Sequence, residues 1–228
     1  MAKFFRFIFL LAIPFFCLSL ENRKNSGTRE FLEKVQKFQE TIKTLKVSFI
    51  QTNDFKMLKT PEVLKGTIYI KKPDAMLYLY EYPEKLYYLV KKGELLVYNP
   101  KKKEAMVQDV ERYQTKVMKY MGAQLPFKEL EKKFDSEIVE DSNKIVHLSF
   151  YPKKKSLQKK LSSLDFWVDE DALTIQKIQV SEAEGDKVIF DFKNWDINPE
   201  LEDQIFDIKI PKGVKVKRSG VNIKEPFQ

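Results

Sequence analysis

The fold of this chain is decided by residues 66–100, which read GTIYIKKPDAMLYLYEYPEKLYYLVKKGELLVYNP. Apolar side chains recur at every second position in short runs, which is the pattern of β-strands. Proline and glycine turns separate the runs, at 72–74, 83–85 and 91–93. The stretch therefore predicts three successive antiparallel strands and the start of a fourth.

The second and third of these strands are apolar on both faces. Leu77 and Leu79 share one face of the second strand, and Met76, Tyr78 and Tyr80 share the other. A sheet that is apolar on both faces must be covered on both, or must face apolar material that is not protein.

Length and composition are typical of a globular domain with a core of its own. The chain has 228 residues, of which 43% are hydrophobic and 32% charged. The net charge of +8 raises the question of nucleic acid or an anionic membrane. However, the lysines gather at turns such as 101–103 and 153–155, where solvation explains them, and no nucleic-acid-binding motif accompanies them. We expect no nucleic-acid partner.

The N-terminus is predicted to be a targeting segment. Two basic residues precede an apolar stretch at 7–18, which is too short to span a bilayer comfortably. Cleavage near Ser19 fits the small residues there. A lipid anchor at Cys17 is the alternative, and the bulky Phe16 in front of it counts against this. The predicted units are a signal peptide at 1–19 and a single, exported, cysteine-free domain at 20–228.

The rest of the chain is read as helices and strands around this sheet. Apolar residues at spacings of four, three, four and three predict an amphipathic helix over Thr28–Leu45. Closely spaced strands joined by tight turns predict a meander. The remaining predicted elements are short helices at 115–121 and 126–134 and strands at 47–53, 105–109, 137–140, 144–151, 161–169, 175–181, 188–195 and 205–210.

Residues for catalysis or metal binding are scarce. The one histidine, His147, lies in a strand, and the one cysteine lies in the leader. Asp165 and the acidic run 169–171 raise the possibility of calcium, but the spacing is not that of an EF-hand and the glycine is missing. No nucleophile or phosphate-binding motif is present. We expect no catalytic residue, no metal and no cofactor. From the pattern alone, the excess apolar surface fits a ligand cavity under a helical lid and an ordinary core equally well.

An ordered set of motifs resembles the periplasmic lipoprotein carriers (LolA) over most of the mature chain. Residues 48–51 (SFIQ) are similar to the family's S-F-x-Q. Residues 66–73 (GTIYIKKP) are similar to its G-x-hydrophobic-aromatic-hydrophobic-K-R-P. Residues 207–214 (DIKIPKGV) are similar to its ending. Further matches to the family pattern follow in the same order at Tyr82-Pro83, Gly93 and Tyr98-Asn99-Pro100.

The resemblance implies an α+β, mostly β fold. It would be an incomplete, strongly curved antiparallel barrel of the LolA/LolB type, with an amphipathic N-terminal helix and a short helical lid. It also implies a monomeric periplasmic carrier. Such a carrier takes lipoprotein acyl chains from an inner-membrane lipoprotein-releasing transporter to an outer-membrane acceptor. The expected cavity residues are Ile68, Ile70, Met76, Tyr78, Tyr80, Tyr88 and Val90, and the expected lid residues are Met118, Met121, Leu125, Phe127 and Leu130.

One position departs from the family pattern. Where the family has an arginine before the proline, which hydrogen-bonds to lid backbone and keeps the empty cavity shut, this chain has Lys72. Lysine offers three donors on a flexible stem but lacks the planar fork of arginine. We expect Lys72 to be the lid latch and to hold the closed state differently.

Two other functions remain open at this level. The first is a carrier or sensor of free lipids or glycolipids on the same fold. The second is an exported enzyme, such as a glycosidase or lipase, which the fold alone does not exclude.

Overall fold

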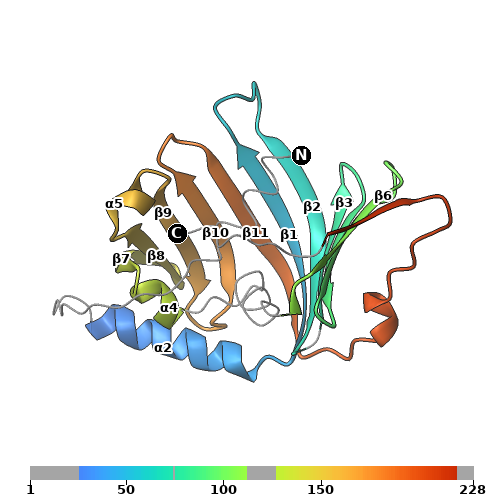
Figure 1. Cartoon of the computed structure of the whole chain (residues 1–228). Helices are drawn as coiled ribbons and strands as arrows, with labels where there is room; N and C mark the ends of the chain where they lie inside the picture. The colour runs from blue at the N-terminus through green and yellow to red at the C-terminus, as the bar shows by residue number, and fades with distance from the viewer. Residues whose placement is uncertain (1–25, 74, 112–126, 220–228) are drawn as a thin grey trace.

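The computed structural model describes residues 26–73, 75–111 and 127–219, which form one curved, unclosed twelve-stranded sheet with a few helices (Figure 1). The helices are α2 (Ser26–Thr41), α4 (Phe127–Glu131), α5 (Lys155–Gln158) and the 3₁₀ helix η3 (Asp203–Phe206). The strands are β1 (Thr44–Asp54), β2 (Glu62–Lys71), β3 (Ala75–Tyr82), β4 (Leu86–Lys91), β5 (Glu94–Asn99), β6 (Glu104–Asp109), β7 (Phe134–Ser142), β8 (Ile145–Pro152), β9 (Leu161–Asp169), β10 (Ile175–Glu182), β11 (Lys187–Ile197) and β12 (Lys215–Ser219).

The sheet consists of two meanders that meet in its middle. Its order is β12-β6-β5-β4-β3-β2-β1-β11-β10-β9-β8-β7, so the predicted meander is confirmed. β1 pairs antiparallel with both β2 and β11, and it therefore joins the first meander to the second. β12 is the exception to the antiparallel pattern, because it runs parallel to β6 at one edge.

The inner face of the sheet is the concave one, and it holds the main core. Leu32 and Val35 of α2, and Ile42 just after the helix, are buried against this inner face. They form one cluster with residues from β1 to β4 and β7 to β11. Figure 1 shows α2 running along one open side of the curved sheet. Of the predicted stripe, Val35 is buried on α2 and Phe31 and Phe38 pack against the same cluster, so the helix packs by about the predicted face.

The outer face of β3 to β5 is covered by residues 201–208, which we call the outer strap. Leu201 and Phe206 are buried there in a second cluster with Leu77 and Leu89. Lys71 Nζ bonds to the Leu201 carbonyl oxygen and Asp203 Oδ1, at 3.3 and 2.6 Å, and Lys91 Nζ bonds to the Phe206 carbonyl oxygen at 3.0 Å. The apolar outer face is thus covered by protein.

The strap also corrects the sequence prediction. A strand was expected over 205–210, but these residues begin in η3 and continue without regular structure. Ile205, Phe206 and Ile208 pack against the outer face of β3 to β5. They do not pair with a neighbouring strand.

Two helical predictions were wrong at their ends. α2 ends at Thr41, and Leu45 is a buried residue of β1. The reason lies in Asn198, whose Oδ1 accepts the backbone N–H groups of Lys43 and Thr44 at 2.7 and 3.3 Å and so starts the strand. The second short helix is limited to α4, because Phe134 already begins β7.

Other differences concern connections. α5 replaces what was expected to be a simple turn after Pro152. The helix predicted over 115–121 lies outside the described residues. None of the helices in the described ranges is both long and apolar enough to cross a bilayer.

Candidate functional site: the inner wall and its helical cover

Seven side chains form what we call the inner wall, and six of them occupy two rows across β2, β3 and β4. Ile68 lies opposite Tyr78, which lies opposite Tyr88; Ile70 lies opposite Met76, which lies opposite Val90. The seventh, Tyr80, lies opposite Gly66. All seven belong to or pack against the inner cluster that contains α2 and α4. The structure thus places the whole expected cavity set on the helix-covered face.

Aromatic rings fill the centre of this wall. The ring of Phe49, on β1, lies 5.1 Å from that of Tyr80 and 5.9 Å from those of Tyr78 and Phe190. Gly66 makes this possible, because a Cβ there would come within 2.9 Å of Phe49 Cζ and would also collide with the Leu79 carbonyl oxygen. The glycine of the GTIYIKKP motif therefore provides space for the ring and for the close approach of β3.

A chain of hydrogen bonds crosses the inner wall, and sequence reasoning missed it. Tyr80 Oη donates to Gln51 Oε1 at 2.8 Å, Gln51 Nε2 donates to Asn53 Oδ1 at 2.8 Å, and Asn53 Nδ2 donates to Glu62 Oε2 at 2.9 Å. Burial raises the pKa of Tyr80, with Tyr78 and Tyr88 adding to the effect. The sequence signal for this chain was Gln51 of the SFIQ motif. It lies two residues after Phe49 in the same strand, so both side chains point to the inner face.

The helical cover is described only in part. Phe127 and Leu130, on α4, are 1% and 3% exposed and pack into the inner cluster. The Phe127 ring stacks on Phe150 and meets Phe166 edge-on, at centroid distances of 5.9 and 5.7 Å. The other expected lid residues, Met118, Met121 and Leu125, lie outside the described residues.

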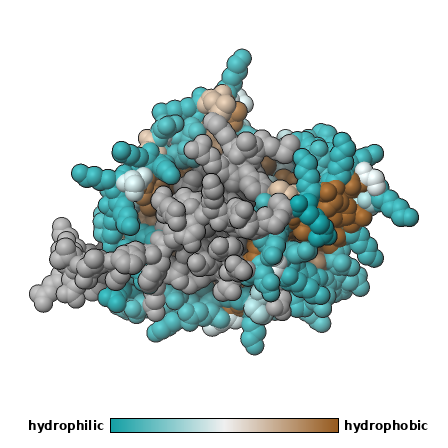
Figure 2. Space-filling view, viewed as in Figure 1, coloured by the Kyte–Doolittle hydropathy of each residue, from teal (hydrophilic) through white to brown (hydrophobic). Residues whose placement is uncertain are grey.

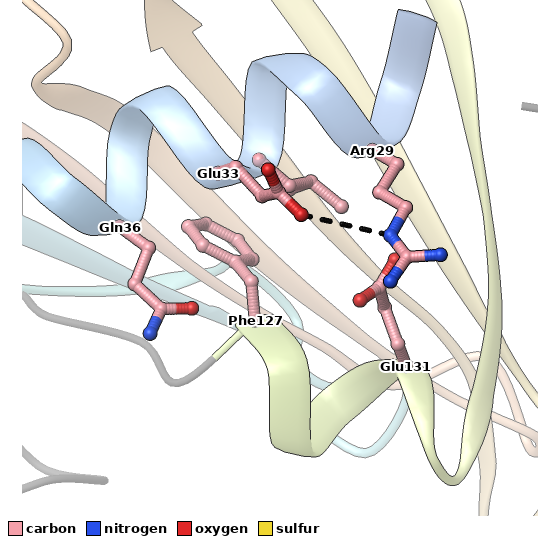
Figure 3. A pocket seen from close by; sticks show the side chains of 6 residues that line it. Arg29, Glu33, Gln36, Phe127 and Glu131 are labelled. Atoms are coloured by element: carbon pink, nitrogen blue, oxygen red, sulfur yellow. Dashed lines mark ion pairs between the residues drawn. The ribbon is translucent and has the colours of Figure 1, made fainter. Parts of the chain in front are cut away.

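A pocket of about 180 Å³ lies between the N-terminal half of α2 and α4 (Figure 3). Its polar groups turn to partners on their own helix, since Arg29 pairs with Glu33 at 3.6 Å and Gln36 Nε2 donates to Glu40 at 3.1 Å. Gln36 Oε1 is buried and accepts no hydrogen bond within the described part of the chain. The two helices therefore meet here with imperfect packing. The pocket is lined by Arg29, Leu32, Glu33, Gln36, Phe127 and Glu131.

The other end of α2 is held firmly. Lys72 Nζ donates to the carbonyl oxygen of Gln39 at 3.0 Å, in the last turn of the helix. Burial lowers the pKa of Lys72, and the nearby Glu40 carboxylate partly offsets this. Asn198 Nδ2 adds a contact to the carbonyl oxygen of Thr41 at 3.4 Å. Lys72 is thus bonded to the backbone of α2, whereas the family pattern implied a bond to the backbone of the lid.

The outer face of β8 and β9 carries a polar cluster around the single histidine. His147 Nε2 lies 3.2 Å from Asp165 Oδ1 and 3.4 Å from Ser149 Oγ. Both partners meet the same ring nitrogen, whereas a relay from nucleophile through base to acid needs them on opposite nitrogens. Asp165 also accepts the Ser163 hydroxyl at 2.6 Å. The geometry is that of a cluster that ties two strands together.

The acidic hairpin beyond it is likewise explained by local bonds. Asp169 Oδ1 accepts the backbone N–H groups of Asp171 and Ala172 at 3.0 and 2.7 Å, which closes the turn between β9 and β10. Across the described ranges, no three His, Cys, Asp or Glu side chains come together in a way that could hold a metal ion.

Comparisons with solved structures agree with this architecture. An uncharacterized conserved protein from Thermus thermophilus is similar with a TM-score of 0.55 at 9% identity, over 85% of this chain and 100% of that one. MucB is similar with a TM-score of 0.55 at 10% identity, over 82% of this chain and 64% of that one. The Pseudomonas aeruginosa MucA/MucB complex gives a TM-score of 0.50 at 11% identity, over 79% and 60%. At these identities the likeness concerns the fold alone.

The sequence itself gives the family. No curated protein matches it. Residues 40–209, however, match the family described as "Outer membrane lipoprotein carrier protein LolA", and this range runs from the end of α2 to just beyond the outer strap. The match covers well over half of the chain and includes the whole inner wall. The chain therefore belongs to the LolA family of outer membrane lipoprotein carrier proteins.

Proposed function

We propose that this protein is a periplasmic carrier that binds the acyl chains of lipoproteins against its inner wall. It would receive them from an inner-membrane transporter and pass them to an outer-membrane acceptor. The observation that carries the proposal is the inner wall itself. Its side chains are apolar or aromatic and face a helical cover that is packed incompletely at one end. Membership of a family of lipoprotein carriers supports the same cargo.

The proposal requires the cover to move. The pocket of about 180 Å³ is smaller than the roughly 300–1,000 Å³ of sites that enclose drug-sized ligands. An acyl chain must therefore displace side chains of α2 or α4 from the inner wall. Lys72 and Asn198 hold α2 at its C-terminal end, whereas the pocket lies beside its N-terminal half. The expected motion is a swing of the N-terminal half of α2 about that fixed end.

Energetics favour a carrier that opens over one that offers an open cavity. Each buried methylene contributes about 0.8 kcal/mol, so long acyl chains bound without any opposing cost would be held too tightly to release. Removing Phe127 and Leu130 from the inner cluster exposes apolar surface when cargo enters. That cost offsets part of the gain and leaves an affinity from which the cargo can be transferred.

Photo-crosslinking tests the proposal directly. A photoreactive phenylalanine analogue would replace Tyr78 on the inner wall and, as the matched control, Tyr87 on the outer face under the strap. The protein would be exported to the periplasm of a bacterial host and irradiated in cells. We expect lipoprotein adducts from position 78 and none from position 87. Equal labelling at both positions, or no lipoprotein adduct at position 78, would refute the proposal.

The alternative cargo, free lipids or glycolipids on the same fold, is separated by a second measurement. Purified protein would be titrated with a fatty-acylated peptide and with the free fatty acid of the same length. The proposal predicts that the acylated peptide competes with lipoprotein for labelling at position 78. If only the free fatty acid displaced the labelled lipoprotein, the protein would instead be a carrier or sensor of free lipids.

A further inference from the structure

The register of the strands assigns each connection between neighbouring strands to one of two rims of the sheet. β1, β3, β5, β8 and β10 end at the same rim, since each pairs antiparallel with the strand that follows it. This rim carries the connections 55–61, 83–85, 100–103, 153–160 and 183–186. The opposite rim carries 92–93, 143–144, 170–174 and the described residues 72–73 of the connection between β2 and β3.

Charge is distributed unevenly between the rims. The four connections 55–61, 83–85, 100–103 and 153–160, which we call the lysine rim, contain eleven lysines and one acidic residue, Glu84. The described residues of these opposite-rim connections contain three lysines and two acidic residues. The fifth connection of the first rim, 183–186, contains Glu184 and Asp186. Asp186 accepts the backbone N–H of Lys56 at 2.8 Å and so fixes the neighbouring hairpin in place.

The hairpin between β1 and β2 extends beyond its neighbours at this rim (Figure 1). The backbone N–H of Leu58 donates to the Phe55 carbonyl oxygen at 2.8 Å, so the turn puts Lys56 and Met57 at the tip. Met57 is 67% exposed and Leu58 is 39% exposed, with Lys56 and Lys59 on either side. In Figure 2, apolar atoms interrupt the hydrophilic surface at the top of the view, over this hairpin.

Exposed tyrosines lie at the same rim. Tyr82, at the end of β3, is 55% exposed, and Tyr151, near the end of β8, is 42% exposed. Lys65 Nζ lies 5.7 Å from the centroid of the Tyr82 ring. Scattered apolar residues on a surface need no explanation. Here, however, two consecutive apolar side chains form the most protruding point of a lysine-rich rim that also presents amphipathic tyrosines.

We infer that the lysine rim docks on an anionic lipid surface, with Met57 and Leu58 entering the interface between headgroups and acyl chains. Apolar tips anchor a peripheral protein by burying area at that boundary, and lysines near the surface strengthen binding to anionic lipids. Tyrosine favours the same layer, because its ring is apolar and its hydroxyl is polar. Docking would bring the strand ends next to the membrane from which a lipid-modified cargo is taken up or to which it is delivered.

Co-sedimentation with vesicles tests this inference without any cargo. Vesicles of phosphatidylcholine alone would be compared with vesicles in which about a third of the lipid is phosphatidylglycerol. We expect binding to the second kind that weakens as salt is raised, because salt screens the attraction. All variants keep the same N-terminus, so any contribution of the leader is constant.

Two variants separate the apolar and the electrostatic parts. Met57→Ser combined with Leu58→Ser should weaken binding to anionic vesicles about tenfold or more, because two apolar side chains no longer enter the interface. Val139→Ser, an exposed apolar residue of β7 away from this rim, is the control and should change nothing. Substituting Lys59, Lys154 and Lys155 by Gln should weaken binding about fivefold per lysine.

The charge control removes the same number of lysines elsewhere. Lys37, Lys46 and Lys92 lie on α2, on β1 and at the opposite rim, and their substitution by Gln should have a clearly smaller effect. Equal effects of the two lysine triples, no effect of the Met57 and Leu58 change, or no binding of wild type to anionic vesicles at low salt would each overturn the inference.

Failure here is distinguishable from failure of the proposed function. The tip variant should still take up an acylated peptide in vesicle-free solution, because Met57 and Leu58 are not part of the inner wall. Conversely, a wild-type protein that binds vesicles but takes up no acylated peptide would refute the carrier function and leave the docking surface in place.

Discussion

Replacing Gly66 by alanine tests how the inner wall is built. The added Cβ would collide with the Leu79 carbonyl oxygen and lie 2.9 Å from Phe49 Cζ and 3.0 Å from the Leu79 carbonyl carbon. Two of these three atoms are backbone of β3, which is held by pairing on both sides. The clash therefore cannot be relieved by turning a side chain, and β2 and β3 must move apart.

The magnitude follows from the kind of contact. Overpacking a core costs about 1–3 kcal/mol, and a clash with backbone belongs at the upper end of that range. With a urea m-value of about 2–3 kcal/mol/M, a loss of about 3 kcal/mol lowers the unfolding midpoint by about 1 M or more. The displaced Phe49 ring should also alter the near-ultraviolet circular dichroism of the folded protein.

The measurement is urea unfolding followed by far-ultraviolet circular dichroism, with Gly27→Ala as the matched control. Gly27 lies in the first turn of α2, and a Cβ there would meet nothing within 4 Å. Alanine is the better helix former, so this variant should be neutral or more stable by up to about 1 kcal/mol. If Gly66→Ala unfolds at the same urea concentration as wild type, the packing argument for the inner wall is refuted.

Three further predictions concern the latch, the buried tyrosines and the polar cluster. Lys72→Met removes the bond to the last turn of α2, so amide hydrogen exchange should quicken in that helix and not in β8 or β9; unchanged exchange in α2 would contradict the role as latch. Burial raises the pKa of Tyr80, so the folded state disfavours its phenolate: the stabilisation is complete below about pH 10 and is lost as the pH rises further. Tyrosinate absorbance in an alkaline titration should therefore appear in two steps, the second coinciding with unfolding, and a single step in the folded protein would contradict this. Asp165→Ala leaves two hydroxyl groups without their acceptor and should cost about 1–3 kcal/mol in urea unfolding while acyl-peptide uptake is unchanged; lost uptake in a folded variant would reopen an active role for the cluster.

Alternation in the sequence, together with the position of Lys72 in the family pattern, placed the residues of the inner wall on one face. Because side chains of a strand point to opposite faces, assigning Ile68 to the inner face assigns its neighbours two residues away as well. The prolines and glycines mark the turns between these strands, so the same assignment of faces continues from β2 to β4. The bounds of β3 and β4 agree with the prediction to within a residue, whereas β2 begins at Glu62, four residues before the stretch from which its strand was predicted.

The cover of the outer face was not predictable in the same way. The strap follows no period, because its residues are held one by one: Phe206 fills a gap over β3 and β4, and Lys71 and Lys91 bond to its backbone. Such contacts link residues more than a hundred positions apart. The end of α2 was missed for the same reason, since its cause is Asn198 on the far side of the sequence.

The position of β1 in the middle of the sheet has a consequence for how the chain folds. Each meander can form from contacts between neighbours in the sequence, but the seam between β1 and β11 joins segments about as far apart as Lys43 and Asn198, which are separated by 155 positions. Pairings of this range are slow to form because the loop entropy is lost before the contact is made. Until β11 pairs with it, β1 is an exposed edge whose backbone donors and acceptors face solvent on that side. A chain that has not yet placed β11 is therefore the form most vulnerable to aggregation, and completion of the sheet depends on Lys187–Ile197, late in the sequence.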